Sequence, residues 1–163
     1  MIPASHMGGG TCLGVPDVCK TPTPAGPVPI PYPNTGMNLQ TSAGTAASKV
    51  YITGQKAVLV QSEIPMSTGD EAGSAGGVVS GKIKGAVKFM VGYPKVQIEK
   101  KMPAMLGSVT THNDMNIVGA QLAPSQVKVL YSPVPAPPAP PATVTGQAQA
   151  GTVAGFAPPP EAG

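Results

Sequence analysis

The sequence predicts an all-β domain of short antiparallel hairpins with many irregular Gly/Pro-rich segments, followed by a low-complexity C-terminal tail. Glycine and proline each occur 21 times in 163 residues, which disfavours helices. Short runs of alternating apolar and polar residues recur between turn residues, as in half-buried strands. The chain has no Trp and only two Phe. A core this poor in large rings depends on backbone pairing, a metal or a partner surface.

The first distinctive segment, residues 8–34, combines three consecutive glycines, both cysteines and a series of prolines: GGGTCLGVPDVCKTPTPAGPVPIPYPN. Proline fixes its own φ, removes an amide donor and pushes the preceding residue toward extended conformations. We therefore expect a stiff irregular strap that crosses other elements, and neither a helix nor a central strand. Its thiols, Cys12 and Cys19, are its most reactive groups.

The next segments alternate between loops and short strands. Residues 37–48 are small and polar and predict a loop. Residues 49–61, KVYITGQKAVLVQ, predict a hairpin with a type II′ turn at Gly54–Gln55. Residues 62–81 predict a long Gly-rich loop around STGDEAG. Residues 82–91, KIKGAVKFMV, predict a strand with one buried face and a bulge at Gly85.

Residues 95–106, KVQIEKKMPAML, repeat the pattern of residues 49–60 at an offset of 46 positions. Val50 and Ile52 fall on Val96 and Ile98, and Leu59 falls on Met105. The match predicts that one supersecondary unit is used at least twice around a pseudo-symmetric body. Residues 126–131, QVKVLY, predict the last strand.

The chain divides into a domain at residues 1–131 and a tail at residues 132–163. The tail is rich in Pro and Ala and has one charged residue, Glu161, and one aromatic residue, Phe156. This composition is typical of polyproline II pieces joined by flexible linkers. We expect a tether rather than a folded unit.

Composition also excludes several classes of function. The net charge of +3 comes from lysine, because the chain has no Arg, and nucleic-acid binding is disfavoured without Arg or stacking rings. No segment reaches the roughly 20 apolar residues of a membrane span. The N-terminus lacks the basic and apolar regions of a secretory signal. We therefore expect synthesis in a reducing cytoplasm, where a Cys12–Cys19 disulfide is disfavoured.

Two cysteines and two histidines are the candidate metal ligands: Cys12, Cys19, His112 and His6. A Cys2His2 set is adequate for tetrahedral zinc and would staple a weak core. The Cys-x6-Cys spacing is longer than the usual zinc interval, and buried thiols that pack as small hydrophobes are the alternative.

Catalytic arrangements are less well supported. Cys19, His112 and Asn113 include the residue types of a thiol hydrolase, without a recognisable nucleophile turn. Asp70 and Glu71 are expected to be surface turn residues in their Gly-rich loop, where they can also accept backbone amides.

Several pieces occur together and in order: GGGTCLGVPDVCKTP, PIPYPN, STGDEAG, GVVSGKIKG and THN. Over roughly residues 5–131 the chain resembles PAAR-like proteins, which cap the spike of type VI secretion systems and related contractile injection machines. The resemblance implies a small conical all-β domain whose broad base sits on a trimeric VgrG-type spike and whose point leads toward a target membrane. It also implies zinc near the tip, with Cys19, His112 and Cys12 matching family positions.

The resemblance favours a non-enzymatic spike-tip protein that is a monomer on a trimer, is assembled in the cytoplasm and is then exported with the spike. A runner-up is an adaptor whose Pro-rich tail recruits an effector. A thiol hydrolase using Cys19 and His112 is the third hypothesis. The chain departs from the wider family in having no Arg and only two His, so a site of three His and one Cys is excluded.

Overall fold

The computed structural model describes residues 1–132, which form one compact unit. Apart from Ser132, the predicted tail lies outside the described residues. Within them, strands and irregular segments dominate, and one 3-10 turn, Asn38–Gln40, is the sole helical element. The all-β prediction is therefore confirmed. No helix among these residues is long and apolar enough to cross a membrane.

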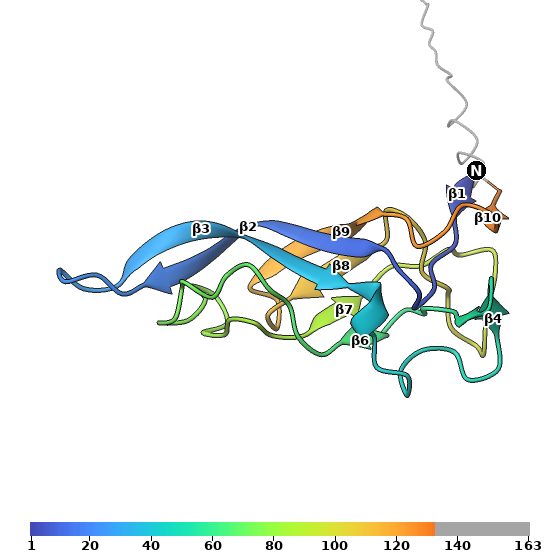
Figure 1. Cartoon of the computed structure of the whole chain (residues 1–163), viewed down its shortest axis with the longest axis horizontal. Helices are drawn as coiled ribbons and strands as arrows, with labels where there is room; N and C mark the ends of the chain where they lie inside the picture. Colours follow the sequence, from blue (N-terminus) through green and yellow to red (C-terminus); the bar gives the residue numbers. More distant parts are fainter. Residues whose placement is uncertain (133–163) are drawn as a thin grey trace, which may run out of the picture. The chain divides into compact units, whose positions relative to one another are not determined.

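The main element of this unit is an antiparallel sheet of six strands in the order β3-β2-β9-β8-β7-β6 (Figure 1). Two small two-stranded pairs, β1–β10 and β4–β5, lie at the other end of the unit from the loop that joins β2 and β3. The sheet strands are β2 (Thr11–Thr21), β3 (Val28–Met37), β6 (Glu63–Ile64), β7 (Val87–Phe89), β8 (Val109–His112) and β9 (Ile117–Ala123). The small pairs are β1 (Ile2–Pro3), β10 (Leu130–Tyr131), β4 (Tyr51–Ile52) and β5 (Gln55–Lys56).

The predicted strap is instead a long hairpin, and β2 is an interior strand of the sheet. Two features let a Pro-rich sequence do this. Pro16 lies where the register shifts between Gly14 and Asp17, so its missing amide falls at a bulge. The prolines of β3 lie on the outer edge of the sheet, where a ladder donor is not needed.

The hydrogen bonds of β2 fix the side on which the β3 prolines lie. The Lys20 amide donates to the 75–78 loop, and the carbonyls of Val18 and Lys20 accept from it. These bonds lie on the side of β2 away from β3. Asp17, Cys19 and Thr21 must then face β3, where their partners are Tyr32, Ile30 and Val28. Pro29, Pro31 and Pro33 alternate with those partners, so they face outward. The outer edge of β3 consequently offers carbonyl acceptors without amide donors along this run, which blocks addition of another strand.

The other strand predictions need smaller corrections. The turn of the first hairpin is at Thr53–Gly54, one residue earlier than predicted, and both residues have positive φ (48° and 86°). That is the type I′ pattern and not type II′. The predicted strand at 82–91 is reduced to Val87–Phe89, with Gly85 preceding it, and the predicted strand at 126–131 is reduced to Leu130–Tyr131.

Candidate functional site

Three short hairpins meet at the end of the unit that carries β1, β4 and β10. Residues 49–60 and 95–106 each turn back on themselves, pairing Ile52 with Gln55 and Ile98 with Lys101. Glu99 and Lys100, at the second turn, both have positive φ, as Thr53 and Gly54 do. The repeat predicted at an offset of 46 residues is therefore confirmed in backbone conformation as well as in sequence.

The third hairpin is split between the two ends of the described chain. Residues 128–131, KVLY, correspond to KVYI at 49–52 and KVQI at 95–98, and residues 2–7 supply the returning arm. Tyr131 pairs with Ile2, as Ile52 pairs with Gln55. The Val129 carbonyl accepts from Ala4 N at 3.0 Å, as the Val50 carbonyl accepts from Ala57 N at 3.1 Å. Pro103, at the corresponding position of the second copy, has no amide to donate.

The returning arms of the three hairpins form a closed ring of backbone hydrogen bonds. Ser5 N donates to Ala104 O at 3.0 Å, Ala104 N to Val58 O at 2.8 Å, and Val58 N to Ser5 O at 3.1 Å. All three residues have no exposed surface. A second set of three bonds joins the same arms, with donors two residues after the ring residues and acceptors two residues before them. These bonds are Met7 N to Lys56 O at 3.0 Å, Val60 N to Met102 O at 2.8 Å and Leu106 N to Pro3 O at 2.9 Å. The arms are thus related by a pseudo-threefold axis.

Serine side chains support the ring in the same threefold manner. Ser62 Oγ, Ser108 Oγ and Ser125 Oγ each accept a backbone amide, from Leu59, Met105 and His6 respectively, and each of the three distances is 2.9 Å. These donors occupy equivalent places, one residue after the ring residues. The symmetry therefore includes side-chain partners, although one serine comes from a segment outside the repeat.

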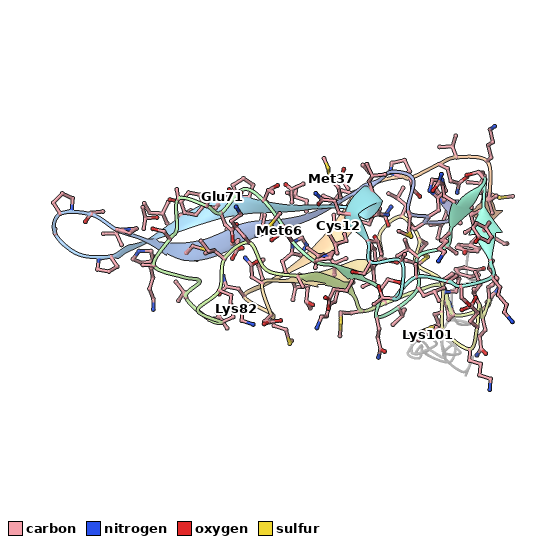
Figure 2. The ribbon with its side chains drawn as sticks, turned by 60° about the horizontal axis from the view of Figure 1, so that its bottom comes forward. Cys12, Met37, Met66, Glu71, Lys82 and Lys101 are labelled. Atoms are coloured by element: carbon pink, nitrogen blue, oxygen red, sulfur yellow. The ribbon has the colours of Figure 1, made fainter. Side chains whose placement is uncertain are left out.

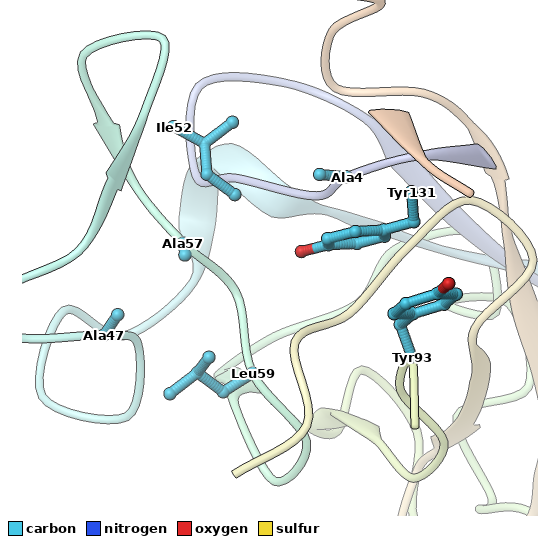
Figure 3. Packing of buried hydrophobic residues seen from close by; sticks show 7 residues of the cluster. All are labelled: Ala4, Ala47, Ile52, Ala57, Leu59, Tyr93 and Tyr131. Atoms are coloured by element: carbon cyan, nitrogen blue, oxygen red, sulfur yellow. The ribbon is translucent and has the colours of Figure 1, made fainter. Parts of the chain in front are cut away.

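The ring separates two apolar clusters. Val58 and Ala104 pack with Cys12, Ile64, Val87 and Phe89 on the sheet side. Their neighbours Ala57 and Leu59 pack with Ala4, Ala47, Ile52, Tyr93 and Tyr131 on the other side (Figure 3). Tyr93 and Tyr131 stack with their ring centroids 4.6 Å apart. Apolar packing above and below thus makes the ring rigid without many large side chains.

A second site is a buried polar cluster between β2, the 65–86 loop and the β8–β9 turn. Asn113 Nδ2 donates to Asp17 Oδ2 and to Asp70 Oδ2, each at 2.6 Å. Asn116 Nδ2 donates to Asp17 Oδ1, and the Lys84 amide donates to Asp70 at 3.0 Å. Asp17, Asp70 and Asn113 have no exposed surface. One amide nitrogen therefore bridges two buried carboxylates, which is a costly arrangement unless every acceptor is satisfied.

The same asparagines order the Gly-rich loop through their oxygens. Asn116 Oδ1 accepts from Val79 N and Ser80 N at 2.8 and 3.0 Å, and Asn113 Oδ1 accepts from Gly85 N at 2.5 Å. The surface role predicted for Asp70 is therefore wrong, because this side chain is an internal acceptor. Glu71 is exposed as predicted, and its carboxylate accepts from Gly69 N at 2.8 Å. Glu71 and Lys82 are labelled in Figure 2, on the part of the unit nearer the hairpin loop.

The four predicted metal ligands have different hydrogen-bond partners, and Cys12 also packs in the apolar cluster on the sheet side. Cys12 Sγ is 3.6 Å from Asn38 Oδ1, and Cys19 Sγ is 3.7 Å from Asp17 Oδ1. His112 uses both ring nitrogens, Nδ1 with Asn34 Oδ1 at 2.6 Å and Nε2 with Thr110 Oγ1 at 3.0 Å. His6 Nδ1 accepts from Gly8 N at 2.8 Å.

One group in the described part of the chain gathers three potential ligand atoms, from Asp17, Cys19 and Asp70, within 4.8 Å of one another. Cys19 is its single member from the predicted set. Structural zinc takes about four ligands, and this group supplies three. Burial, and then the Asp17 and Asp70 charges, raise the pKa of Cys19 to about 12. The carboxylates already accept protein amides. This donor set does not fit tetrahedral zinc as it stands, and the Cys12, Cys19, His6 and His112 site stays a prediction.

The pKa shifts describe buried neutral groups. Burial raises the pKa of Cys12 to about 12 and lowers that of His112 to about 4, with the Asp70 charge opposing the latter shift. The pKa of His6 is also lowered, mainly by burial. Cys19 and His112 have different partners and neither is exposed. The geometry accordingly offers no nucleophile–base pair to the thiol hydrolase hypothesis.

Comparison with known proteins identifies a family and a relative. A model of the toxin PAAR-like domain matches residues 10–119. The chain is 40% identical over 118 residues to the DNase toxin Tse7 of Pseudomonas aeruginosa. That match spans 68% of this chain and 30% of the relative. No solved structure matches the chain.

The motifs that carry the resemblance meet in the buried polar cluster, because Asp17 and Cys19 belong to PDVCKTP, Asp70 to STGDEAG and Asn113 to THN. The domain model covers more than half of the chain. On this evidence the chain belongs to the toxin PAAR-like domain family.

Proposed function

We propose that this chain is a non-enzymatic tip protein that caps the trimeric VgrG-type spike of a type VI secretion, or contractile injection, system. The observation that carries the proposal is the pseudo-threefold ring. A monomer that offers three similar contact regions around one axis can contact the three subunits of a homotrimer in equivalent ways. The hairpins at 49–60, 95–106 and 128–131 with 2–7 supply three such regions.

The end of the unit that carries the ring is preorganised for binding. Its hydrogen bonds close on themselves, and apolar clusters support both sides of the ring. A preorganised surface loses less entropy on association. A rigid base also transmits force, which a cap needs if it is to lead a spike through a target membrane.

We assign the leading role to the β2–β3 hairpin, at the other end of the described unit (Figure 1). Its strands continue beyond their shorter neighbours in the sheet, and prolines occupy the outer edge of β3. Without amide donors this edge does not recruit another strand. Such a hairpin does not associate edge to edge with another strand. The buried polar cluster binds Asp17 of β2 and so fixes the hairpin to the rest of the unit.

The adaptor hypothesis keeps the same cap and adds an effector. The similarity to part of a DNase toxin supports it, since the matched segment is 30% of that relative. We propose no nuclease or hydrolase chemistry for the described residues. We also propose cytoplasmic assembly followed by export with the spike. Zinc remains a prediction whose direct test is metal analysis of the purified chain.

The proposal is tested by size-exclusion chromatography with light scattering of the full chain mixed with the trimeric spike protein of the same secretion system. We expect one copy per trimer, and loss of secretion when the chain is deleted. Failure to bind the trimer together with unchanged secretion would overturn the proposal. Residues 132–163 are then deleted to test the adaptor, since unchanged export of every effector would remove that role.

A further inference from the structure

Each of the three hairpins begins with the same dipeptide, Lys-Val: Lys49–Val50, Lys95–Val96 and Lys128–Val129. The valines hold equivalent places. The carbonyls of Val50 and Val129 accept the amides of Ala57 and Ala4, and proline occupies the matching position of the second copy. The three lysines therefore stand in equivalent positions around the pseudo-threefold axis, although they are far apart in the sequence.

All three lysines are exposed. Within residues 1–132 the ion pairs are Lys82–Asp114 and Lys88–Glu63, so the lysines of the hairpins have no acidic partner there. The hairpins carry six lysines and one acid, Glu99. The Glu99 carboxylate accepts the backbone amides of Ser48 and Lys49 at 2.8 and 2.7 Å. These two bonds, and then the nearby Lys49 charge, lower the pKa of Glu99. Six lysines against one acid still leave this end of the unit with a net positive charge. Lys101, beside the second turn, is labelled in Figure 2.

A valine follows each of the three equivalent lysines in the chain. Val96 and Val129 are 36% and 39% exposed, and Val50 is half-buried. Lysine has a long apolar stem below a compact charge, so each lysine by itself offers both an apolar contact and a cation. The flexible stem also tolerates small departures from exact symmetry, which a split and imperfect repeat requires.

We propose that Lys49, Lys95 and Lys128 form a threefold set of contacts, each pairing with the same carboxylate on one subunit of a homotrimeric partner. The inference rests on the proposed function and specifies its surface. A homotrimer necessarily presents any carboxylate three times around its axis. Among the charged residues of the hairpins, the lysine before valine is the one found in all three copies. The partner therefore has an acidic ring around an apolar centre at its threefold end.

The test measures the affinity of the full chain for the purified trimeric spike protein of the same secretion system at low and high salt. Lys49→Glu, Lys95→Glu and Lys128→Glu are made singly and together. We expect each single reversal to weaken binding by about 5- to 20-fold, by a similar factor for all three, and the triple variant by about 1,000-fold. Wild-type affinity should fall with salt.

The matched control reverses three lysines at the same end that are not threefold-equivalent: Lys56→Glu, Lys100→Glu and Lys101→Glu together. It changes net charge by the same amount, so it isolates long-range attraction from the proposed contacts. We expect a loss of about 10-fold or less. Lys→Gln variants at the three equivalent positions provide a second set if the reversed variant fails to fold.

The outcomes separate the two proposals. If the wild-type chain does not bind the trimer, the spike-cap function itself fails. If it binds, but the equivalent and control triple variants lose the same affinity, or the equivalent variant loses none, the lysine contacts are wrong and the cap remains. Loss of binding to phosphatidylserine vesicles with unchanged trimer binding would overturn the inference in favour of a membrane surface.

Discussion

At the end that carries β1, β4 and β10, backbone hydrogen bonds hold three chain segments together, whereas near the β2–β3 hairpin side-chain amides do so. The ring at Ser5, Val58 and Ala104 places one donor and one acceptor of each residue in a cycle. It depends little on side-chain identity, and the three ring residues differ. The polar cluster depends on Asp17, Asp70 and Asn113 individually. Backbone groups therefore set the geometry of one end, and particular side chains set that of the other.

The polar cluster should give the largest effect on stability. Asn113→Ala removes the donor shared by two buried carboxylates and the acceptor of Gly85 N. Because uncompensated buried charges remain, we expect a loss of about 3–5 kcal/mol in the free energy of unfolding, measured by urea denaturation. Asp114→Asn is the neighbouring control. Its carboxylate is exposed and pairs with Lys82, so a loss close to the error of the measurement is expected. Equal losses for the two variants would contradict the clustered role.

The ring should give the next largest effect, and the molecule supplies a matched pair of alanines. Ala104→Pro removes the amide that donates to Val58 O and opens the ring. We expect a loss of about 3 kcal/mol in the free energy of unfolding and loss of spike binding. Ala57→Pro removes an amide that lies outside the ring, at the position where the second copy already has Pro103. A loss of about 1 kcal/mol is expected. A larger loss for Ala57→Pro would argue against threefold equivalence.

The parts of the fold that depend on local patterns can be predicted from the sequence. The offset between Val50 and Val96 was visible, but the third copy was not, because it is split between residues 128–131 and the N-terminus. The strap was predicted as irregular because proline was weighed against a central strand. The register places Pro16 at a bulge and the β3 prolines on the outer edge, and neither fact is local.

The candidate site shows the same limit. Cys and His are the predicted ligands because their chemistry favours metals. The groups around Cys19 are instead the carboxylates of Asp17 and Asp70 and the amide of Asn116. Asp70 and Asn116 come from distant segments. Asp17 and Asn113 are 96 positions apart. The residue types alone do not predict that Asn113 of THN contacts Asp17 of PDVC. The sequence feature that links the two motifs is their joint occurrence in one family pattern.

The pH dependence of stability reports on the sheet interior near the polar cluster. Burial lowers the pKa of His112 to about 4 from an ordinary 6.5. The unfolded chain therefore binds the proton first as pH falls. Stability from this group is full above about pH 6.5, declines between 6.5 and about 4, and levels off below that. The loss approaches roughly 3 kcal/mol.

The measurement is urea denaturation of wild type and His112→Gln at intervals from pH 7.5 to 4. His6, whose pKa is also lowered, is common to both chains, so the difference between the curves isolates His112. We expect the variant to be less stable at pH 7, since Asn34 and Thr110 lose their ring partner, and to have a flatter profile. Parallel curves would contradict a buried neutral imidazole.

The smallest effect is expected at Cys19, where the structure and the sequence-predicted zinc site make opposite forecasts. A protonated thiol whose Sγ is 3.7 Å from Asp17 Oδ1 makes a weak hydrogen bond. Cys19→Ser should then cost about 1 kcal/mol or less, and dialysis against EDTA should not change Tm. A zinc ligand behaves otherwise, because removing it releases the metal and with it folding free energy. Metal analysis of wild type, Cys19→Ser and Cys12→Ser, with thermal melts before and after EDTA, separates the two. Stoichiometric zinc that is lost in both variants, with a fall of about 10 °C or more in Tm, would restore the predicted metal staple and require the side chains around Cys19 to rearrange.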